Sequence, residues 1–500
     1  MKRRYKIHRS DKYREINWHR QHKWSGIAAV ALLLVFCLSG IVLNHRSLFA
    51  GAEVSRRWLP SWYEFHDWNG GLMRGTIPWG GSLMVFGSNG VWIADTVSGS
   101  VAEFNQGFPK GADFRQVRNV VATRGSYYAA TTTALYRLDD GLWREVPVGF
   151  GGDAERITDL SVHGDTMIVA GRSRLYVSAA PYAPFVGEEL PAAKGQGRKV
   201  SLFKTVWMLH SGELFGLPGR IVVDLVAAVL VVLSLTGLVH WLLPMLMKSR
   251  GRRGLTVAKA AKFFRSNFSL HNTAGRLTIV LTIVVVVTGW CLRPPIMIPL
   301  AMNKTAPVPG SELDHENPWH DKLRIIRYDE ETSEWLLSTS EGFYAFKTPG
   351  EIPRKVDTQF PVSVMGLNVL EKDSAGNWLC GSFSGMFRWD RKSGNATDYF
   401  TGKPVKTKSG VPFGKVAVSG YSEELGAVVE YGKGTSALRQ PEELGNLPMS
   451  LWNVSLEAHT GRLFMGPVAT YLYIFFAGFI CFWCLLSGWK VRNKQRIGHA

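Results

Sequence analysis

Four long apolar runs constrain this chain of 500 residues more than any other feature of its sequence. They lie at 24–44, 221–244, 271–292 and within 457–489. Each contains close to the 20 or so residues that cross the hydrocarbon core of a bilayer as a helix. Backbone polar groups in lipid must be satisfied within the segment itself, which a helix achieves. We therefore predict four transmembrane helices.

The net charge of +18 indicates how the helices are oriented. Segments 1–23, 245–270 and 490–500 together carry 20 Lys and Arg but only two acids, so they account for the whole excess. Basic residues that flank membrane spans mark the cytoplasmic side. We expect an inner-membrane, multi-pass protein with both termini inside. The basic runs adjoin apolar spans, so they predict contact with membrane lipid and no nucleic-acid partner.

This orientation divides the chain into ten segments. They are a basic cytoplasmic N-terminus (1–23), a first helix (24–44), a first outer β-rich part (45–207), an interfacial segment (208–220), a second helix (221–244), a basic cytoplasmic loop (245–270), a third helix (271–292), a second outer β-rich part (293–456), an interfacial segment with the fourth helix (457–489), and a cytoplasmic tail (490–500).

The two halves of the chain repeat one plan. The phrase SLFKTVWMLHSGELF at 201–215 recurs as SLWNVSLEAHTGRLF at 450–464, with its histidine at the same position. Both halves run from inside to outside and back, so the repeats are parallel and related by a pseudo-two-fold axis along the membrane normal. The fold class we predict is a four-helix transmembrane bundle made from two parallel repeats, with an all-β extracytoplasmic region.

The outer segments have the pattern of short strands separated by Gly, Asn and Asp turns. Each half contains three units of about 35–45 residues, which is the period of propeller blades. The pattern favours one composite β-propeller closed from both halves. Two separate β-sandwich domains are the alternative.

Four histidines recur at matching positions near the predicted membrane boundaries. His22 pairs with His271 at the cytoplasmic face, and His210 pairs with His459 at the outer face. Two neutral imidazoles that approach from opposite sides can serve as axial ligands of a haem iron. The alternative is that each histidine only fixes an interfacial turn through a hydrogen bond.

Other residues near these positions could complete such sites. Gly26 and Gly275 lie one turn from the cytoplasmic pair and would leave room for a flat macrocycle, and Arg220 and Arg276 could meet haem propionates. His45 and His240 also lie at the predicted membrane faces, so they could serve as ligands. They are only alternates because neither has a symmetry mate in the other half of the chain. The candidate ligands of the iron are His22, His271, His210 and His459.

The phrases around these histidines are similar to a known family. An apolar helix that opens with His22-x-x-x-Gly26 and ends in Ser-Gly, together with HSGELFGLPGR at 210–220, resembles the PepSY-associated transmembrane family. Its members include di-haem inner-membrane reductases of ferric siderophores. The copy at 459–467 departs from this pattern after Phe464, and the outer segments do not resemble the α+β PepSY module typical of the family.

The resemblance implies a protein with two b-type haems that carries electrons from a cytoplasmic-side donor to an extracytoplasmic acceptor, ferric iron or a ferric siderophore. The loop 245–270 is too short for a dinucleotide-binding βαβ unit, so the donor would be a separate reductase, a quinol or reduced flavin. The outer partner would be an iron chelate or a protein. The pattern identifies no catalytic residue. A non-enzymatic sensor or assembly factor with a ligand-binding β-propeller is the alternative function.

The charge distribution makes a prediction about topology. Reporter fusions after residues 150 and 400 should give an extracytoplasmic signal, and a fusion after residue 258 should give a cytoplasmic one, because the basic segments stay inside. Alkaline phosphatase and green fluorescent protein fusions measure the two sides independently. A cytoplasmic signal at residue 150 would overturn the whole arrangement.

Overall fold

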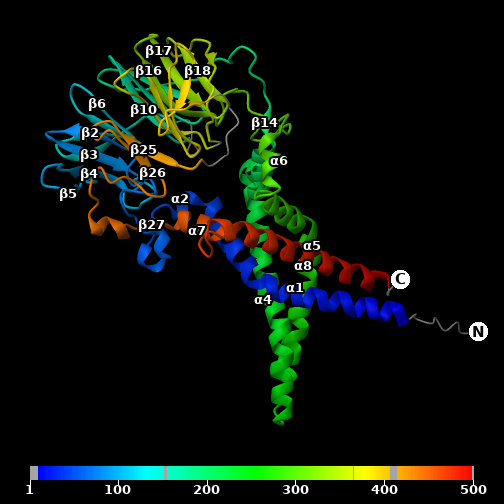
Figure 1. The fold of residues 1–500 in the computed structure, drawn as a ribbon. Coiled ribbons are helices and arrows are strands. Elements are labelled where there is room, and N and C mark those ends of the chain that lie inside the picture. Colours follow the sequence, from blue (N-terminus) through cyan, green and yellow to red (C-terminus); the bar gives the residue numbers. More distant parts are fainter. Residues whose placement is uncertain (1–8, 151–154, 364, 406–413, 498–500) are drawn as a thin grey trace, which may run out of the picture. The chain divides into compact units, whose positions relative to one another are not determined.

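The computed structural model describes residues 9–150, 155–363, 365–405 and 414–497 (Figure 1). The outermost parts of the predicted segments 1–23 and 490–500 lie outside the described residues. The chain divides into two compact units. The helical unit comprises residues 1–49, 198–314 and 451–500, and the strand unit comprises residues 50–197 and 315–450.

Four long helices dominate the helical unit. They are α1 (Arg9–Asn44), α4 (Gly216–Arg252), α5 (Ala258–Cys291) and α8 (Pro467–Ile497). All four are long and apolar enough to cross a membrane. α1 packs against α4 and α8, and α5 packs against the same two helices, so α1 and α5 face each other across the bundle.

Two short helices precede the second and fourth long helices. α3 (Leu202–Ser211) packs against α5, and α7 (Leu451–His459) packs against α1. α3 ends at Gly212, whose φ of +83° lies in the left-handed region. Glycine adopts this conformation without the steric strain that a side chain would cause. A Cβ on Gly212 would lie 2.3 Å from the carbonyl oxygen of Gly219. Gly461 has a φ of +79° at the matching position after α7. The repeated phrase is thus a short helix, its terminating glycine and the turn into a spanning helix.

The remaining elements of the helical unit are small. They are α2 (Arg46–Phe49), the 3-10 turn η3 (Glu213–Phe215), α6 (Met297–Met302), and the two-stranded pair of β14 (Val200–Ser201) with β15 (Lys304–Thr305).

In its described residues the strand unit contains six antiparallel sheets in which each strand pairs with the next in sequence, three from each half of the chain, besides one two-stranded pair that joins the halves. The first sheet of the first half comprises β2 (Gly75–Trp79), β3 (Ser82–Gly87), β4 (Gly90–Ala94) and β5 (Val101–Glu103). The second comprises β6 (Val117–Ala122), β7 (Tyr127–Thr131), β8 (Leu135–Asp139) and β9 (Leu142–Val146). The third comprises β10 (Asp159–His163), β11 (Thr166–Ala170), β12 (Leu175–Ala179) and β13 (Val186–Glu188).

The second half supplies sheets of four, five and two strands. They are β16 (Leu323–Asp329), β17 (Glu334–Thr339), β18 (Gly342–Phe346) and β19 (Arg354–Val356); β20 (Leu367–Lys372), β21 (Trp378–Ser382), β22 (Gly385–Trp389), β23 (Ala396–Asp398) and β24 (Pro404–Val405); and β25 (Val418–Ser422) with β26 (Ala427–Glu430). A further pair joins β1 (Glu53–Val54) to β27 (Met449–Ser450), and the strand unit also has three 3-10 turns, η1 (Arg56–Trp58), η2 (Ser61–Tyr63) and η4 (Glu442–Asn446).

The first strands of successive sheets contact one another. β2 contacts β6, β6 contacts β10, β10 contacts β16, β16 contacts β20, β20 contacts β25, and β25 contacts β2. The contact of β10 with β16 and that of β25 with β2 join the two halves of the chain.

Recurrent loop chemistry explains where several hairpins turn. Asp95 accepts hydrogen bonds from the backbone N–H of Val97 and from the Ser98 hydroxyl, and Gly99 follows with a φ of +72°. Asp390, Ser393 and Gly394 repeat the arrangement between β22 and β23. A short acceptor side chain followed by a glycine at positive φ is a turn signal that the sequence carries openly.

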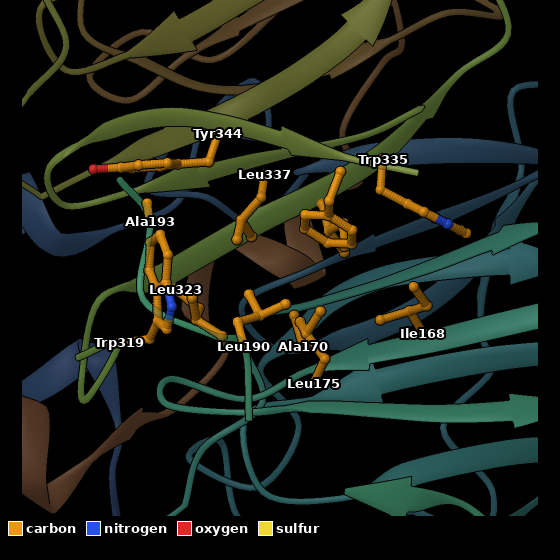
Figure 2. Close-up of a cluster of buried hydrophobic side chains, with 12 residues drawn as sticks. Ile168, Ala170, Leu175, Leu190, Ala193, Trp319, Leu323, Trp335, Leu337 and Tyr344 are labelled. Atoms are coloured by element: carbon orange, nitrogen blue, oxygen red, sulfur yellow. The ribbon is translucent and has the colours of Figure 1, made fainter. Parts of the chain in front are cut away.

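The seam between β10–β12 and β16–β18 is filled by large apolar side chains (Figure 2). Trp319, Leu323 and Leu337 come from the second half, and Ile168 and Leu175 come from the first half. Trp319 is fully buried, and its indole N–H donates a hydrogen bond to the carbonyl oxygen of Pro191 at 2.9 Å. Burial of a side chain of this size contributes a few kcal/mol, so the seam stabilises the association of the halves.

An ionic contact reinforces the same seam. Arg327 on β16 forms salt bridges with Asp159 on β10 and with Glu371 on β20. Asp159 is 3% exposed and also accepts a hydrogen bond from the backbone N–H of Ile326 at 2.9 Å. At the seam between β2 and β25, the N–H of Tyr421 donates to the carbonyl oxygen of Arg74 at 3.0 Å, and Thr76 contacts the Ser422 hydroxyl and the Glu424 carboxylate.

Removal of the Arg327 guanidinium should open the β10–β16 seam. Arg327→Leu would leave a buried carboxylate without its partner, which costs about 3–5 kcal/mol. Amide hydrogen exchange at β10 and β16 in the purified full chain should measure this loss of local stability.

The matched control is Arg354→Ala, because the Arg354 side chain is 62% exposed in its salt bridge with Glu334. An exposed pair of this kind contributes less than about 1 kcal/mol. Equal exchange in the two variants would contradict the importance of the buried pair.

Candidate site of paired histidines

Four histidines of the helical unit lie as two facing pairs. The ring centres of His22 on α1 and His271 on α5 are 6.3 Å apart, with an angle of 59° between the ring planes. Those of His210 on α3 and His459 on α7 are 6.0 Å apart, with an angle of 51°. The structure therefore brings together the pairs that the repeat predicts.

Each pair lies at a different level of the bundle. Gly40, which faces His459, follows His22 by 18 residues on α1. A helix rises about 1.5 Å per residue, so the two levels are about 27 Å apart along α1. This distance is close to the thickness of the hydrocarbon core of a bilayer.

The Nδ1 atom of three of the four imidazoles is held by a backbone carbonyl of the neighbouring helix. His210 Nδ1 lies 2.9 Å from the carbonyl oxygen of Val285, and His459 Nδ1 lies 3.1 Å from that of Phe36. His22 Nδ1 lies 3.0 Å from the carbonyl oxygen of Cys484. A carbonyl oxygen only accepts, so Nδ1 carries the hydrogen and Nε2 keeps a lone pair.

A hydroxyl three residues after that carbonyl makes a second contact with each ring. His271 Nδ1 lies 2.8 Å from Thr236 Oγ1, and His459 Nδ1 lies 2.9 Å from Ser39 Oγ. His210 and His22 contact Thr288 and Ser487 in the same way, both at 3.4 Å. These hydroxyls donate their own hydrogens to carbonyls of their helices, so they accept from the imidazole.

A glycine follows each of these hydroxyl residues and lies against the ring. A Cβ on Gly289 would be 2.6 Å from His210 Cε1, and one on Gly488 would be 3.0 Å from His22 Cε1. The corresponding distances are 3.5 Å from Gly40 to His459 and 3.6 Å from Gly237 to His271. The Ser-Gly and Thr-Gly dipeptides therefore orient the histidines as well as allowing close packing of helices.

The outer pair is neutral at ordinary pH. Burial, with a further contribution from His210, lowers the pKa of His459 to about 3. Burial also lowers the pKa of His210 below its ordinary value. A neutral imidazole with a free Nε2 is the form that binds a metal ion.

The geometry fits a metal ion held between two axial imidazoles. Two rings that bind one ion from opposite sides, each through a bond of about 2 Å, have centres about 6 Å apart. Both pairs meet this spacing. Across the described residues, no group of three or more His, Cys, Asp and Glu side chains could hold a metal ion.

The alternate histidines lie elsewhere. His45 Nε2 lies 2.7 Å from Asp224 Oδ2 on α4, so its imidazole is engaged by a carboxylate. The ring of His240 packs 5.3 Å from that of His271 and against Phe264 and Phe268. His240 is thus a neighbour of the first pair, whereas His45 belongs to a separate contact between α1 and α4.

Several accessory residues take other places than the sequence suggested. A Cβ on Gly26 would meet Cys484 Sγ at 3.7 Å, and one on Gly275 would meet Leu233 at 3.7 Å, so both glycines face neighbouring helices. Arg276 is exposed and Arg220 is half-buried, and neither makes a described contact with a histidine pair. The residues that hold the rings, Ser39, Thr236, Thr288 and Ser487, were not among the predicted site residues, although Ser39 follows His22 by 17 residues and Thr288 follows His271 by the same number.

Comparisons with known proteins agree with the repeat. A family model described as "PepSY-associated TM region" matches residues 1–244 and again 244–491. No curated protein matches the sequence.

Among solved structures, the extracellular domain of a protein described as a hybrid two component system of B. thetaiotaomicron is 9% identical. The match covers 73% of this chain and 31% of that one, with a TM-score of 0.34. A second, described as a one component system of the same organism, is 8% identical over 75% of this chain and 38% of that one, with a TM-score of 0.32. This chain therefore spans about a third of their length, and the scores assign no fold.

Crowding at Gly289 makes a prediction about the outer pair. Gly289→Ala would press a methyl group against His210 and displace its ring, so any metal group bound there should be lost or held about tenfold more weakly. The absorption spectrum of the purified protein measures this. Gly275→Ala is the control, because its Cβ has room at 3.7 Å. Identical spectra for both variants would show that the ring position does not matter.

Proposed function

This chain belongs to the family of PepSY-associated transmembrane regions, and from this premise we propose that it is an inner-membrane haem b protein that carries electrons across the bilayer. The two facing imidazole pairs, each with Nδ1 fixed and Nε2 free, are the observation that carries the proposal. His22 and His271 would hold one haem, and His210 and His459 would hold the other.

Haem supplies one-electron redox chemistry that crosses a low-dielectric slab without movement of an ion. The chain's contribution is to hold four neutral imidazoles in fixed orientation. The carbonyls of Val285, Phe36 and Cys484 each fix one tautomer, and they belong to the neighbouring helices α5, α1 and α8.

The strand unit is the candidate site for the electron acceptor. We propose that its six sheets form one composite β-propeller, with β10–β16 and β25–β2 as the contacts that join the halves. The acceptor we propose is ferric iron or a ferric siderophore. The donor is a cytoplasmic reductase, a quinol or reduced flavin, with both chain termini inside and the strand unit in the periplasm.

The absorption spectrum of the purified protein tests the proposal directly. A red, detergent-solubilised protein with a split low-spin b-type spectrum supports electron transfer. A colourless protein that still folds would contradict it and would favour the alternative, a membrane-anchored sensor or assembly factor.

The pairing predicts the effect of removing single imidazoles. His22→Ala and His271→Ala should give the same single-haem spectrum, because a low-spin iron needs both axial nitrogens. His210→Ala and His459→Ala should share a different one. Reduced-minus-oxidised spectra separate the two patterns.

His240→Ala and His45→Ala serve as matched controls and should retain both haem signals. If His240→Ala removed the signal that His22→Ala preserved, the symmetric pairing would be wrong.

A further inference from the structure

Among the residues that the structure describes, an arginine near the outer histidine pair forms no salt bridge with a carboxylate. Arg293 follows the last residue of α5 by two positions and is half-buried. Its charge acts on His459, and it lies near Glu457, Tyr471 and the like charge of Arg462. In the described part of the chain, no carboxylate forms a salt bridge with Arg293.

Glu457, the carboxylate whose charge acts on Arg293, is already engaged by another arginine. Glu457 accepts two hydrogen bonds from Arg462, at 2.8 Å from Nε and at 2.5 Å from Nη2. Both oxygens of Glu457 accept from Arg462 in this bidentate pair. Two arginines near the two neutral imidazoles therefore share the charge of this one carboxylate.

A partly buried guanidinium without a counter-ion is costly, as its charge has lost water and gained no anion. Burial lowers the pKa of Arg293 to about 10, which reflects this cost. A guanidinium offers paired N–H donors that match the two oxygens of a carboxylate. A bound carboxylate would supply the missing charge.

We propose that Arg293, with Arg462 behind it, forms a carboxylate-binding site at the outer histidine pair. This inference rests on the proposed function, since the carboxylate belongs either to a haem propionate or to an extracytoplasmic iron chelate such as ferric citrate. In this proposal Arg293 takes the role of binding a carboxylate that the sequence suggested for Arg220 and Arg276.

The test uses the purified full chain with Arg293→Gln, the conservative Arg293→Lys, and Arg198→Gln as a control that removes one exposed positive charge. If the carboxylate is a propionate, Arg293→Gln lowers the midpoint potential of the outer haem or releases that haem. Arg293→Lys then restores part of the loss, and Arg198→Gln has no effect. The cytoplasmic haem signal stays unchanged in all variants.

If the carboxylate belongs to a chelate, the haem spectrum and potential stay as in the wild type. Reoxidation of the reduced protein by ferric citrate then slows about tenfold or more in Arg293→Gln, since a charged hydrogen bond of 1.4 kcal/mol or more is lost. Reoxidation by a ferric trihydroxamate, which has no free carboxylate, keeps its rate.

Iron-free citrate gives a readout that needs no haem. Citrate should raise the unfolding temperature of the wild type but not that of Arg293→Gln if the site takes a free carboxylate. Failure of the proposed function, a folded chain without haem, is thereby separated from failure of this site.

Three outcomes would overturn the inference. The first is that Arg293→Gln equals the wild type in potential, citrate-dependent rate and citrate stabilisation. The second is that Arg220→Gln produces these losses and Arg293→Gln does not. The third is that the effect of Arg293→Gln appears only in vesicles rich in phosphatidylglycerol, which would identify a lipid phosphate as the partner.

Discussion

The hydrogen bond from a histidine Nδ1 to a carbonyl on the neighbouring helix, which His22, His210 and His459 make, is the interaction on which the helical unit depends. Within a helix, a carbonyl normally accepts from the N–H four residues later. The carbonyls of Phe36, Val285 and Cys484 accept in addition from an imidazole. A carbonyl has two lone pairs, so the extra bond costs the helix nothing and fixes the ring. The glycine that follows the hydroxyl residue on the same helix has no side chain, so the imidazole ring can approach the helix backbone closely.

These contacts also hold the bundle together in a medium where apolar burial gives little preference for one helix arrangement over another. Lipid chains are as apolar as leucine side chains, so specificity must come from close packing and polar contacts. Every described histidine contact of this kind joins neighbouring helices of the bundle or a short helix to a long one. The strand unit relies on apolar burial as well as on polar contacts, because its main seam combines large buried aromatic groups with a buried ion pair.

The sequence predicted much of this arrangement because its signals were periodic. Four apolar runs and a duplicated phrase predicted the helices and the partners His210 and His459. The sequence did not reveal that Ser39 and Thr236 hold rings, because a Ser-Gly or Thr-Gly dipeptide has the same local pattern whether it meets a helix or an imidazole. Arg293 was likewise not among the predicted site residues. Which side chain lies near a charge depends on how helices pack, and no spacing along one helix specifies that.

The distribution of contacts between the two repeats has a consequence for how such a site could arise. His22 and His210 belong to the first repeat, and His271 and His459 to the second. Each ring is held by a hydroxyl from the other repeat, as His459 is by Ser39 and His210 by Thr288. A single repeat therefore contains no complete site. Two copies of one repeat related by a two-fold axis would contain both, because an isologous dimer supplies every residue twice. Gene fusion of such a homodimer would leave the paired histidines intact while freeing each outer β-rich half to diverge.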